Sequence, residues 1–210
     1  MDGRLTADEP ISEWLRSLAS TGPGPGGGAA AALMAGMAAA LAEMVVAHRT
    51  RRNSPDDEVH RRSLEAFSAA IRDAAPAMAD QDADASAGFA AANQPRDARD
   101  RSTARRDASL AAAESAASLG RFATTLLPVL RELVDDASTL LLADVGVAAA
   151  TLAASTRAAA LNVCTDLLLA AEAGNGRSDL LQAFDELEAT TGDLLAIVDR
   201  VRERLHPSRA

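Results

Sequence analysis

The sequence predicts an all-α protein, built as a single-domain bundle of long, alanine-rich helices. Apolar residues recur at helical spacing along the chain, and no run alternates with the period of a β-strand. Hydrophobic residues make up 48% of the chain but aromatic residues only 2%, so the core must consist of helices packed closely together. The 210 residues suffice for one well-buried domain. We expect it over residues 10–206, after a flexible lead-in at residues 1–9.

The first two predicted helices are separated by a glycine-rich turn. Pro10 suits a first helical turn, and apolar residues from Ile11 to Leu18 follow at helical spacing. A second helix, made almost wholly of small residues, follows the turn and is expected to end near His48. The backbone N–H groups at its start lack internal partners, and a turn without Cβ atoms leaves them accessible. The turn contains Gly26, Gly27 and Gly28.

The middle of the chain predicts two helices that contain breaks. A third helix is expected to begin at Pro55, and Pro76 is expected to kink or interrupt it. The next helix opens in the charged stretch 97–107, with kinks expected at Gly120 and Pro128.

Small residues recur every four positions on two of the predicted helices. The second of these runs from about Asp144 to Ala173, ahead of a last helix that begins at Ser178. A face without bulky side chains lets another helix approach closely, either within the chain or across a two-fold axis, and we therefore expect a homodimer. The two sets are Gly28, Ala32, Gly36 and Ala40, and Gly146, Ala150, Ala154 and Ala158.

Charge, cysteine content and hydropathy limit the partners and the cellular location that the sequence predicts. The net charge of −9 and the pI of about 4.8 argue against nucleic acid. Cys164 is the single cysteine, so no internal disulfide can form and a cytoplasmic location is the simplest. Residues 29–47 are weakly hydrophobic and include Glu43, which favours a buried helix over a membrane span. The mixed charge of the first residues predicts no secretory signal.

Two stretches are candidates for chemistry, and each has a simpler structural explanation. Asp80, Asp82 and Asp84 are the most concentrated carboxylate cluster, and on a helix Asp82 points away from the other two. The cluster is either a solvated acidic face or the source of one carboxylate that moves a proton in a cleft. The glycine turn is likewise either a plain helix start or an anion-binding ligand site.

Asp144 and Asn162 are a further candidate pair on one predicted helix. They are 18 positions apart, roughly 27 Å at 1.5 Å per residue. If both are functional, a second subunit or another end of the molecule is implied; the alternative role of Asp144 is a helix cap. The three histidines show no metal-ligand spacing, so no metal site is predicted.

Four motifs occur in order between about residues 11 and 172. They are Pro-Gly-Gly-Gly at 25–28, Asp-Gln-Asp-Ala at 80–83, Asp-Val-Gly-Val-Ala-Ala at 144–149 and Leu-Asn-Val at 161–163, and a Pro-Arg pair stands at 95–96. Together they resemble the cyclodeaminase/cyclohydrolase family, which includes the C-terminal half of formiminotransferase-cyclodeaminase.

The resemblance implies an all-helical, dimeric enzyme that acts on folate one-carbon adducts. Some members release ammonia from 5-formiminotetrahydrofolate to give the methenyl form, and others hydrolyse the methenyl form. Asp82 and Asp144 would then act in acid/base chemistry, with a tetrahydrofolate derivative as substrate, no metal and no tightly bound cofactor. The resemblance implies substrate-binding roles for Gly26, Gly27, Gly28, Asp80, Arg96 and Asn162.

The chain departs from the family pattern at four places. Ala29 and Ala143 replace serines, Arg96 replaces a lysine, and residues 138–142 replace a Gly-Asn-x-Asn run. A guanidinium is a poor proton donor or acceptor, because its pKa exceeds ~12. The alternative function is therefore a family member that no longer turns over folate. It would serve as a binding or scaffold dimer, or act on another small molecule.

Overall fold

The protein is helical throughout the part of the chain that the structure describes. The computed structural model describes residues 5–21, 24–49, 55–92, 97–171 and 177–206, and no β-strand occurs in these ranges. The all-α prediction is therefore confirmed. The helices are α1 (Ile11–Leu18), α2 (Gly27–Ala47), α3 (Pro55–Ala92), α4 (Ala98–Thr124), α5 (Leu127–Asp136), α6 (Thr139–Ala171) and α7 (Ser178–Arg204), preceded by a 3-10 turn, η1 (Thr6–Asp8).

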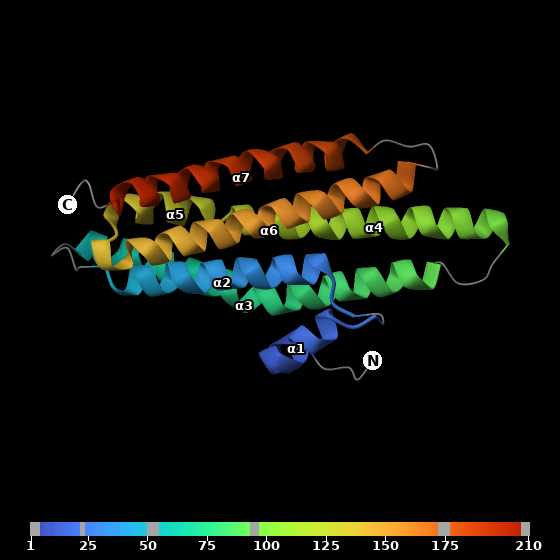
Figure 1. The fold of residues 1–210 in the computed structure, drawn as a ribbon, viewed down its shortest axis with the longest axis horizontal. Coiled ribbons are helices and arrows are strands. Elements are labelled where there is room, and N and C mark those ends of the chain that lie inside the picture. The colour runs from blue at the N-terminus through green and yellow to red at the C-terminus, as the bar shows by residue number, and fades with distance from the viewer. Residues whose placement is uncertain (1–4, 22–23, 50–54, 93–96, 172–176, 207–210) are drawn as a thin grey trace.

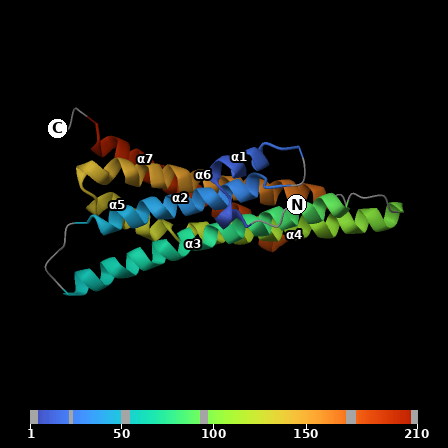
Figure 2. The same ribbon diagram turned by 90° about the horizontal axis from the view of Figure 1, so that it is seen from below.

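The long helices follow the long axis of the bundle (Figure 1). α2 packs against α3 and α6, and α6 also packs against α4 and α7, so α2 and α6 run side by side (Figures 1 and 2). The short α1 lies on the outside of the bundle (Figure 1). Its Trp14 is buried in an apolar cluster with small residues of α2 and with Ala79 of α3.

The small-residue face of α2 is used inside the chain. Gly36 lies where α3 comes closest, because a Cβ at this position would be 2.7 Å from the Cβ of Ala75. Gly28 and Ala32 on the same face are also buried. The first of the two predicted close contacts is therefore a contact between α2 and α3.

The small-residue face of α6 is only partly covered. Gly146 lies against Val201 of α7, whereas Ala150 and Ala154 are exposed. The second predicted face thus has no neighbour over its middle turns within the described residues.

Buried hydroxyl groups join α6 to its neighbours. The Ser155 hydroxyl donates to the backbone carbonyl of Ala31 in α2, at 2.7 Å. The hydroxyls of Thr156 in α6 and Thr191 in α7 are 2.8 Å apart and hydrogen-bonded. Because buried polar groups need partners, these bonds fix the positions of α2 and α7 along α6.

The predicted interruption at Pro76 and the predicted kink at Pro128 both differ from the structure. α3 continues through Pro76 without a break, since the packing of α3 on α2 compensates for the one helical hydrogen bond that proline removes. The chain does not kink at Pro128 but ends α4 at Thr124 and begins α5 at Leu127. Pro128 then stands in a first turn, where its missing N–H has no helical partner to lose.

The start of α6 also differs from the prediction. The helix begins at Thr139, five residues before Asp144. Ser138 accepts from the N–H groups of Leu141 and Leu142 through its carbonyl. Asp144 is therefore inside the helix and is not its N-terminal cap, which corrects that alternative role.

α2 and α6 are each long and apolar enough to cross a membrane, by length and composition alone. The bundle buries 56% of the apolar window of α2 and 50% of that of α6. About half of each apolar window is thus fully buried inside the protein.

Candidate functional site

The start of α2 is capped by a side chain from another helix. Gly26, at the N-cap position, is extended (φ −120°, ψ −158°) and supplies no capping side chain. Instead, Asp82 of α3 accepts a hydrogen bond from the Ala29 N–H through its Oδ2 atom, at 2.9 Å. A carboxylate is favoured here by the free amides and the positive end of the helix dipole.

The absence of a side chain at Gly28 makes room for this carboxylate. A Cβ built on Gly28 would lie 1.8 Å from Oδ1 of Asp82, far inside any permitted contact. Asp82 faces α2 because it continues the face of α3 that buries Ala75 and Ala79. The glycine and the aspartate therefore form one structural unit.

α6 contributes two further polar side chains near the start of α2. The side-chain amide of Asn162 lies next to Gly27, with its Oδ1 atom 3.6 Å from where a Cβ on that glycine would be. Asp166 follows one helical turn later on the same face of α6. It lies close enough to Asp82 for the charge of that carboxylate to affect its pKa.

The two carboxylates hold protons more tightly than ordinary aspartates. Burial raises the pKa of Asp82, and the hydrogen bond from the Ala29 N–H partly opposes this. Burial also raises the pKa of Asp166 to about 6, and the negative charge of Asp82 adds to the rise. Both carboxylates, one at the start of α2 and one on the neighbouring face of α6, thus have raised pKa values, which makes them candidates for acid/base chemistry.

Asp80 has a different environment from Asp82. Its Oδ1 atom accepts from the Thr6 backbone N–H at 3.0 Å and from the Thr6 hydroxyl at 2.6 Å. These bonds hold η1 against α3, in a segment that the sequence predicts as a flexible lead-in. Asp84 is exposed. The prediction that Asp82 points away from its two neighbours agrees with this arrangement.

The structure separates Asp144 from this group. Asp144 is half-buried on the same continuous helix as Asn162, 18 residues earlier, which places it roughly 27 Å away along the axis. Arg96 lies outside the described residues. The start of α2 thus gathers the glycine turn, Asp82 and Asn162 from the predicted set, but not Asp144.

Asp166 is the residue that sequence analysis missed. It stands among apolar residues near the end of α6 and belongs to none of the four motifs. The available signal was its spacing of four residues from Asn162, which places both polar side chains on one face of the helix.

A cavity of about 470 Å³ lies at the opposite end of the bundle, where the first turns of α3 diverge from α2 (Figure 2). Its arginines are already paired. Arg49 binds Glu132 at 2.6 Å and also Asp136, and Arg61 binds Glu58 at 2.9 Å. This cavity therefore has its cations engaged by carboxylates of the chain. Over the described ranges, no group of three or more His, Cys, Asp or Glu residues could hold a metal ion.

Comparison with known proteins identifies the family. A family model described as formiminotransferase-cyclodeaminase matches residues 10–173. The chain belongs to this family. The cyclodeaminase match begins just before α1 and includes the glycine turn, Asp82, Asn162 and Asp166, while α7 lies beyond it.

A solved structure has the same fold. It is formiminotetrahydrofolate cyclodeaminase from Thermotoga maritima, with 23% sequence identity and a TM-score of 0.79 over 95% of this chain and 96% of that chain. A search of curated proteins finds no match. The fold and family inferred from the four motifs are thereby confirmed.

Proposed function

We propose that this protein is a folate one-carbon enzyme that converts 5-formiminotetrahydrofolate into the methenyl form with release of ammonia. The observation that carries the proposal is the carboxylate pair of Asp82 and Asp166 beside the glycine turn, in a chain of the cyclodeaminase family. The pair supplies a proton acceptor and a proton donor at one position.

Cyclodeamination needs one proton removed from N10 and two protons delivered to the leaving nitrogen. N10 of the folate attacks the formimino carbon and forms the new N10–C bond, and the proton on N10 passes to a carboxylate. The former imine nitrogen takes up that proton and a second one from the other carboxyl group, its bond to the formimino carbon breaks, and it leaves as ammonia with the positive charge remaining on the methenyl product. Asp82 and Asp166 suit this sequence because a proton shared by the pair can be moved from one nitrogen to the other.

The surrounding groups are suited to hold the substrate. Carboxylates accept hydrogen bonds from an amino-heterocycle such as a pterin, and the Asn162 amide can both donate and accept. In this proposal the glycine turn shapes the pocket, and Gly26 and Gly27 let the substrate approach the backbone.

Hydrolysis of the methenyl form is the second reaction that this site could perform. Water would replace the leaving amine as the group that exchanges protons with Asp82 and Asp166. We further propose that the protein acts by acid/base chemistry of its side chains without a tightly bound cofactor, as a homodimer in the cytoplasm. Its partners then include neither nucleic acid nor a membrane.

An absorbance assay with both folate adducts tests the proposal. Wild-type protein is expected to form the methenyl product from the 5-formimino substrate, and Asp82→Asn to lower kcat by roughly 10²- to 10⁴-fold. Asp84→Asn, on the exposed side of α3, is the matched control and should keep wild-type kcat.

Titration calorimetry separates an enzyme from a family member that has lost folate. Tetrahydrofolate and its 5-formyl derivative should bind to the wild-type protein with measurable heat. No heat at high micromolar concentration, together with no turnover of either adduct, contradicts the proposal. That result would favour the alternative, a scaffold dimer or an enzyme for another small molecule, to which the replacement of two family serines by Ala29 and Ala143 points.

A further inference from the structure

Arg105 of α4 is a half-buried cation that the chain does not pair. Arg105 has neither a hydrogen bond nor an ion pair within the described residues. Because a guanidinium is always charged and its removal from water is costly, this position suits an anion that the chain itself does not supply. The other half-buried arginines in the described part of the chain each bind a carboxylate, and they are Arg49, Arg61, Arg72, Arg106 and Arg177.

Arg105 lies on the inward face of α4. Ser109, one turn later, is 1% exposed, and Ala116, three turns later, is 2% exposed. Spacings of 4 and 11 residues keep side chains on one face of a helix, so Arg105 continues this buried stripe toward the start of α4. Because helical side chains lean toward the N-terminus of their helix, the guanidinium extends toward the end of the bundle where α4 begins.

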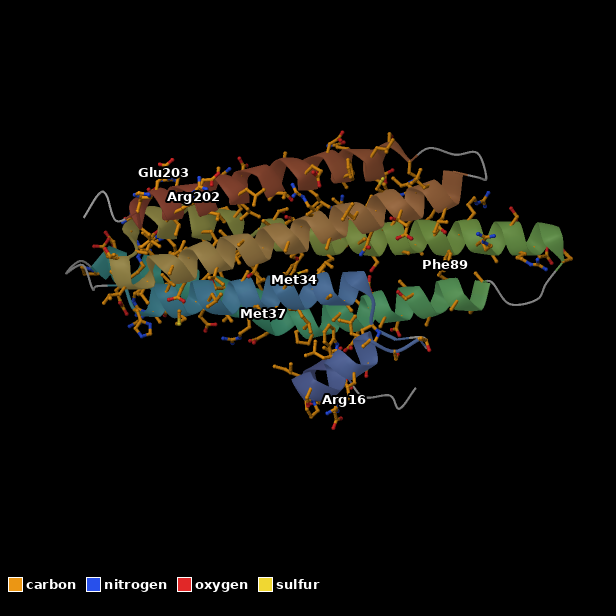
Figure 3. All side chains as sticks on the ribbon, viewed as in Figure 1. Arg16, Met34, Met37, Phe89, Arg202 and Glu203 are labelled. Atoms are coloured by element: carbon orange, nitrogen blue, oxygen red, sulfur yellow. The ribbon has the colours of Figure 1, made fainter. Side chains whose placement is uncertain are left out.

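α2 does not reach that end of the bundle. It begins at Gly27, whereas α3, α4 and α6 continue past its first turn (Figures 1 and 2). Phe89 of α3 marks this region in Figure 3. It follows Asp82 by seven residues, about two turns, and is half-buried on the same face of α3. The interior beyond the start of α2 is therefore bordered by α3, α4 and α6, with Asp82 at its inner end and an aromatic ring farther out.

The register of α4 against α6 gives the separation between Arg105 and the carboxylate pair. The two helices run antiparallel (Figure 1), and a Cβ on Gly120 would lie 3.1 Å from the Cβ of Ala159. Position 113 of α4, seven residues before Gly120, is therefore level with Asp166, seven residues after Ala159. Arg105 is eight residues farther along α4, roughly 12 Å at 1.5 Å per residue. This separation is consistent with the raised pKa of Asp166, which no arginine lowers.

We propose that Arg105 binds a carboxylate group of the substrate, and so selects ligands that have an amino-heterocycle at one end and a carboxylate at the other. The inference rests on the proposed function, because a folate carries its glutamyl carboxylates across an aminobenzoyl ring from the pterin. With the pterin beside Asp82, the aminobenzoyl ring lies near Phe89 and the glutamyl group reaches Arg105. A guanidinium binds a carboxylate through two parallel hydrogen bonds, which favours this group over a neutral one.

Titration calorimetry with ligands that carry one end or both tests this role. 5-Formyltetrahydrofolate carries both ends, N-(4-aminobenzoyl)-L-glutamate lacks the pterin, and 6-methyltetrahydropterin lacks the carboxylates. Arg105→Gln should weaken binding of the first two by roughly 10- to 100-fold, as expected for a charged hydrogen-bonded pair, and leave the third unchanged. Arg105→Lys should recover part of the loss, because it keeps the charge without the planar fork. Equal affinity of the wild type and Arg105→Gln for 5-formyltetrahydrofolate would overturn the proposal.

Arg106→Gln is the matched control. Arg106 is also half-buried on α4, but its guanidinium binds Asp107 at 2.9 Å, and it points about 100° away from Arg105 around the helix. This variant should keep wild-type affinity for all three ligands. Thermal unfolding adds a readout that needs no ligand. Arg105→Gln should keep the wild-type Tm, because its side chain has no partner to lose, and a lowered Tm would overturn the proposal in favour of a structural role.

Steady-state kinetics separate failure of this inference from failure of the proposed function. The carboxylate is remote from the reacting atoms, so Arg105→Gln should raise KM for the 5-formimino substrate by roughly 10- to 100-fold, with kcat within about twofold. If the wild type turns over the substrate and Arg105→Gln has the same KM, the inference fails and the proposed function stands. If the wild type turns over neither adduct, yet Arg105→Gln weakens binding of N-(4-aminobenzoyl)-L-glutamate, the proposed function fails and the carboxylate site stands.

Discussion

The two ends of α3 hold carboxylates in opposite electrostatic environments. Near the start of the helix, hydrogen bonds from Arg61 and Arg62 lower the pKa of Glu58 to about 2. Near its other end, burial raises the pKa of Asp82, and the described partner of that carboxylate is a backbone N–H. The same chemical group is thus fixed as an anion at one end and able to take up a proton at the other.

The neighbouring helices reproduce this contrast. Burial would raise the pKa of Glu132 in α5, but hydrogen bonds from Arg49 and His60 outweigh it and hold that pKa below its usual value. In α6, burial and the negative charge of Asp82 raise the pKa of Asp166 to about 6, and no arginine offsets them. A carboxylate in an ion pair therefore stays ionised and stabilises the fold. A carboxylate that is buried without a cation can take up and release a proton, and so is available for acid/base chemistry.

The largest effect is expected from closing the space that Asp82 occupies. Gly28→Ala places a Cβ 1.8 Å from Oδ1 of Asp82, so the carboxylate must leave the start of α2. We expect activity to fall at least as far as in Asp82→Asn, and thermal unfolding to show a loss of roughly 1–3 kcal/mol.

Gly88→Ala is the matched control for this substitution. It lies on α3, where nothing stands within 4 Å of the new Cβ. It should leave activity unchanged and stabilise the protein by up to about 1 kcal/mol, because alanine favours a helix over glycine. Equal losses of activity and stability in the two variants would contradict the role assigned to Gly28.

A medium effect is expected from the charge of Asp166. The pKa of Asp166 is raised in the folded protein from 3.8 to about 6, so the folded state binds this proton more tightly than the unfolded state. Wild-type stability therefore decreases as pH rises from about 4 to 6, and stays lower above pH 6.

Asp166→Asn should remove this decrease. Chemical denaturation should show the free energies of unfolding of the variant and the wild type changing alike below pH 4, with the variant gaining on the order of 1 kcal/mol above pH 6, because solvent partly screens the charge of Asp166. A variant that loses stability relative to the wild type between pH 4 and 7 would contradict the environment described for Asp166.

The smallest effect is expected at the opposite end. Because the pKa of Glu58 is lowered to about 2, its ion pairs stabilise the fold above about pH 4.5 and lose this effect as pH falls toward 2. Glu58→Gln should lower the Tm slightly at pH 7, not at all near pH 2, and less in 1 M salt. Its turnover should match that of the wild type, and a large loss of turnover would move the functional site to this end.

Much of this architecture could be predicted from local sequence. The glycine turn before an alanine-rich helix, and the spacing that turns Asp82 away from Asp80, both follow from helix geometry. The boundary of α6 also has a local signal that the prediction does not use, because Ser138, a favoured N-cap residue type, stands directly before Thr139. The importance of Asp166 depends on α3 and α6 meeting at the start of α2, and no local pattern contains that contact.

A carboxyl titration tests the central claim most directly. In protein labelled with carbon-13 at the aspartate carboxyl groups, NMR should show Asp166 titrating at about pH 6, with Asp82 above the usual range. In Asp82→Asn, the pKa of Asp166 should fall, because the neighbouring negative charge is gone. Titration of both groups near 3.8 in the wild type, unchanged by that substitution, would contradict a proton-sharing pair at the glycine turn.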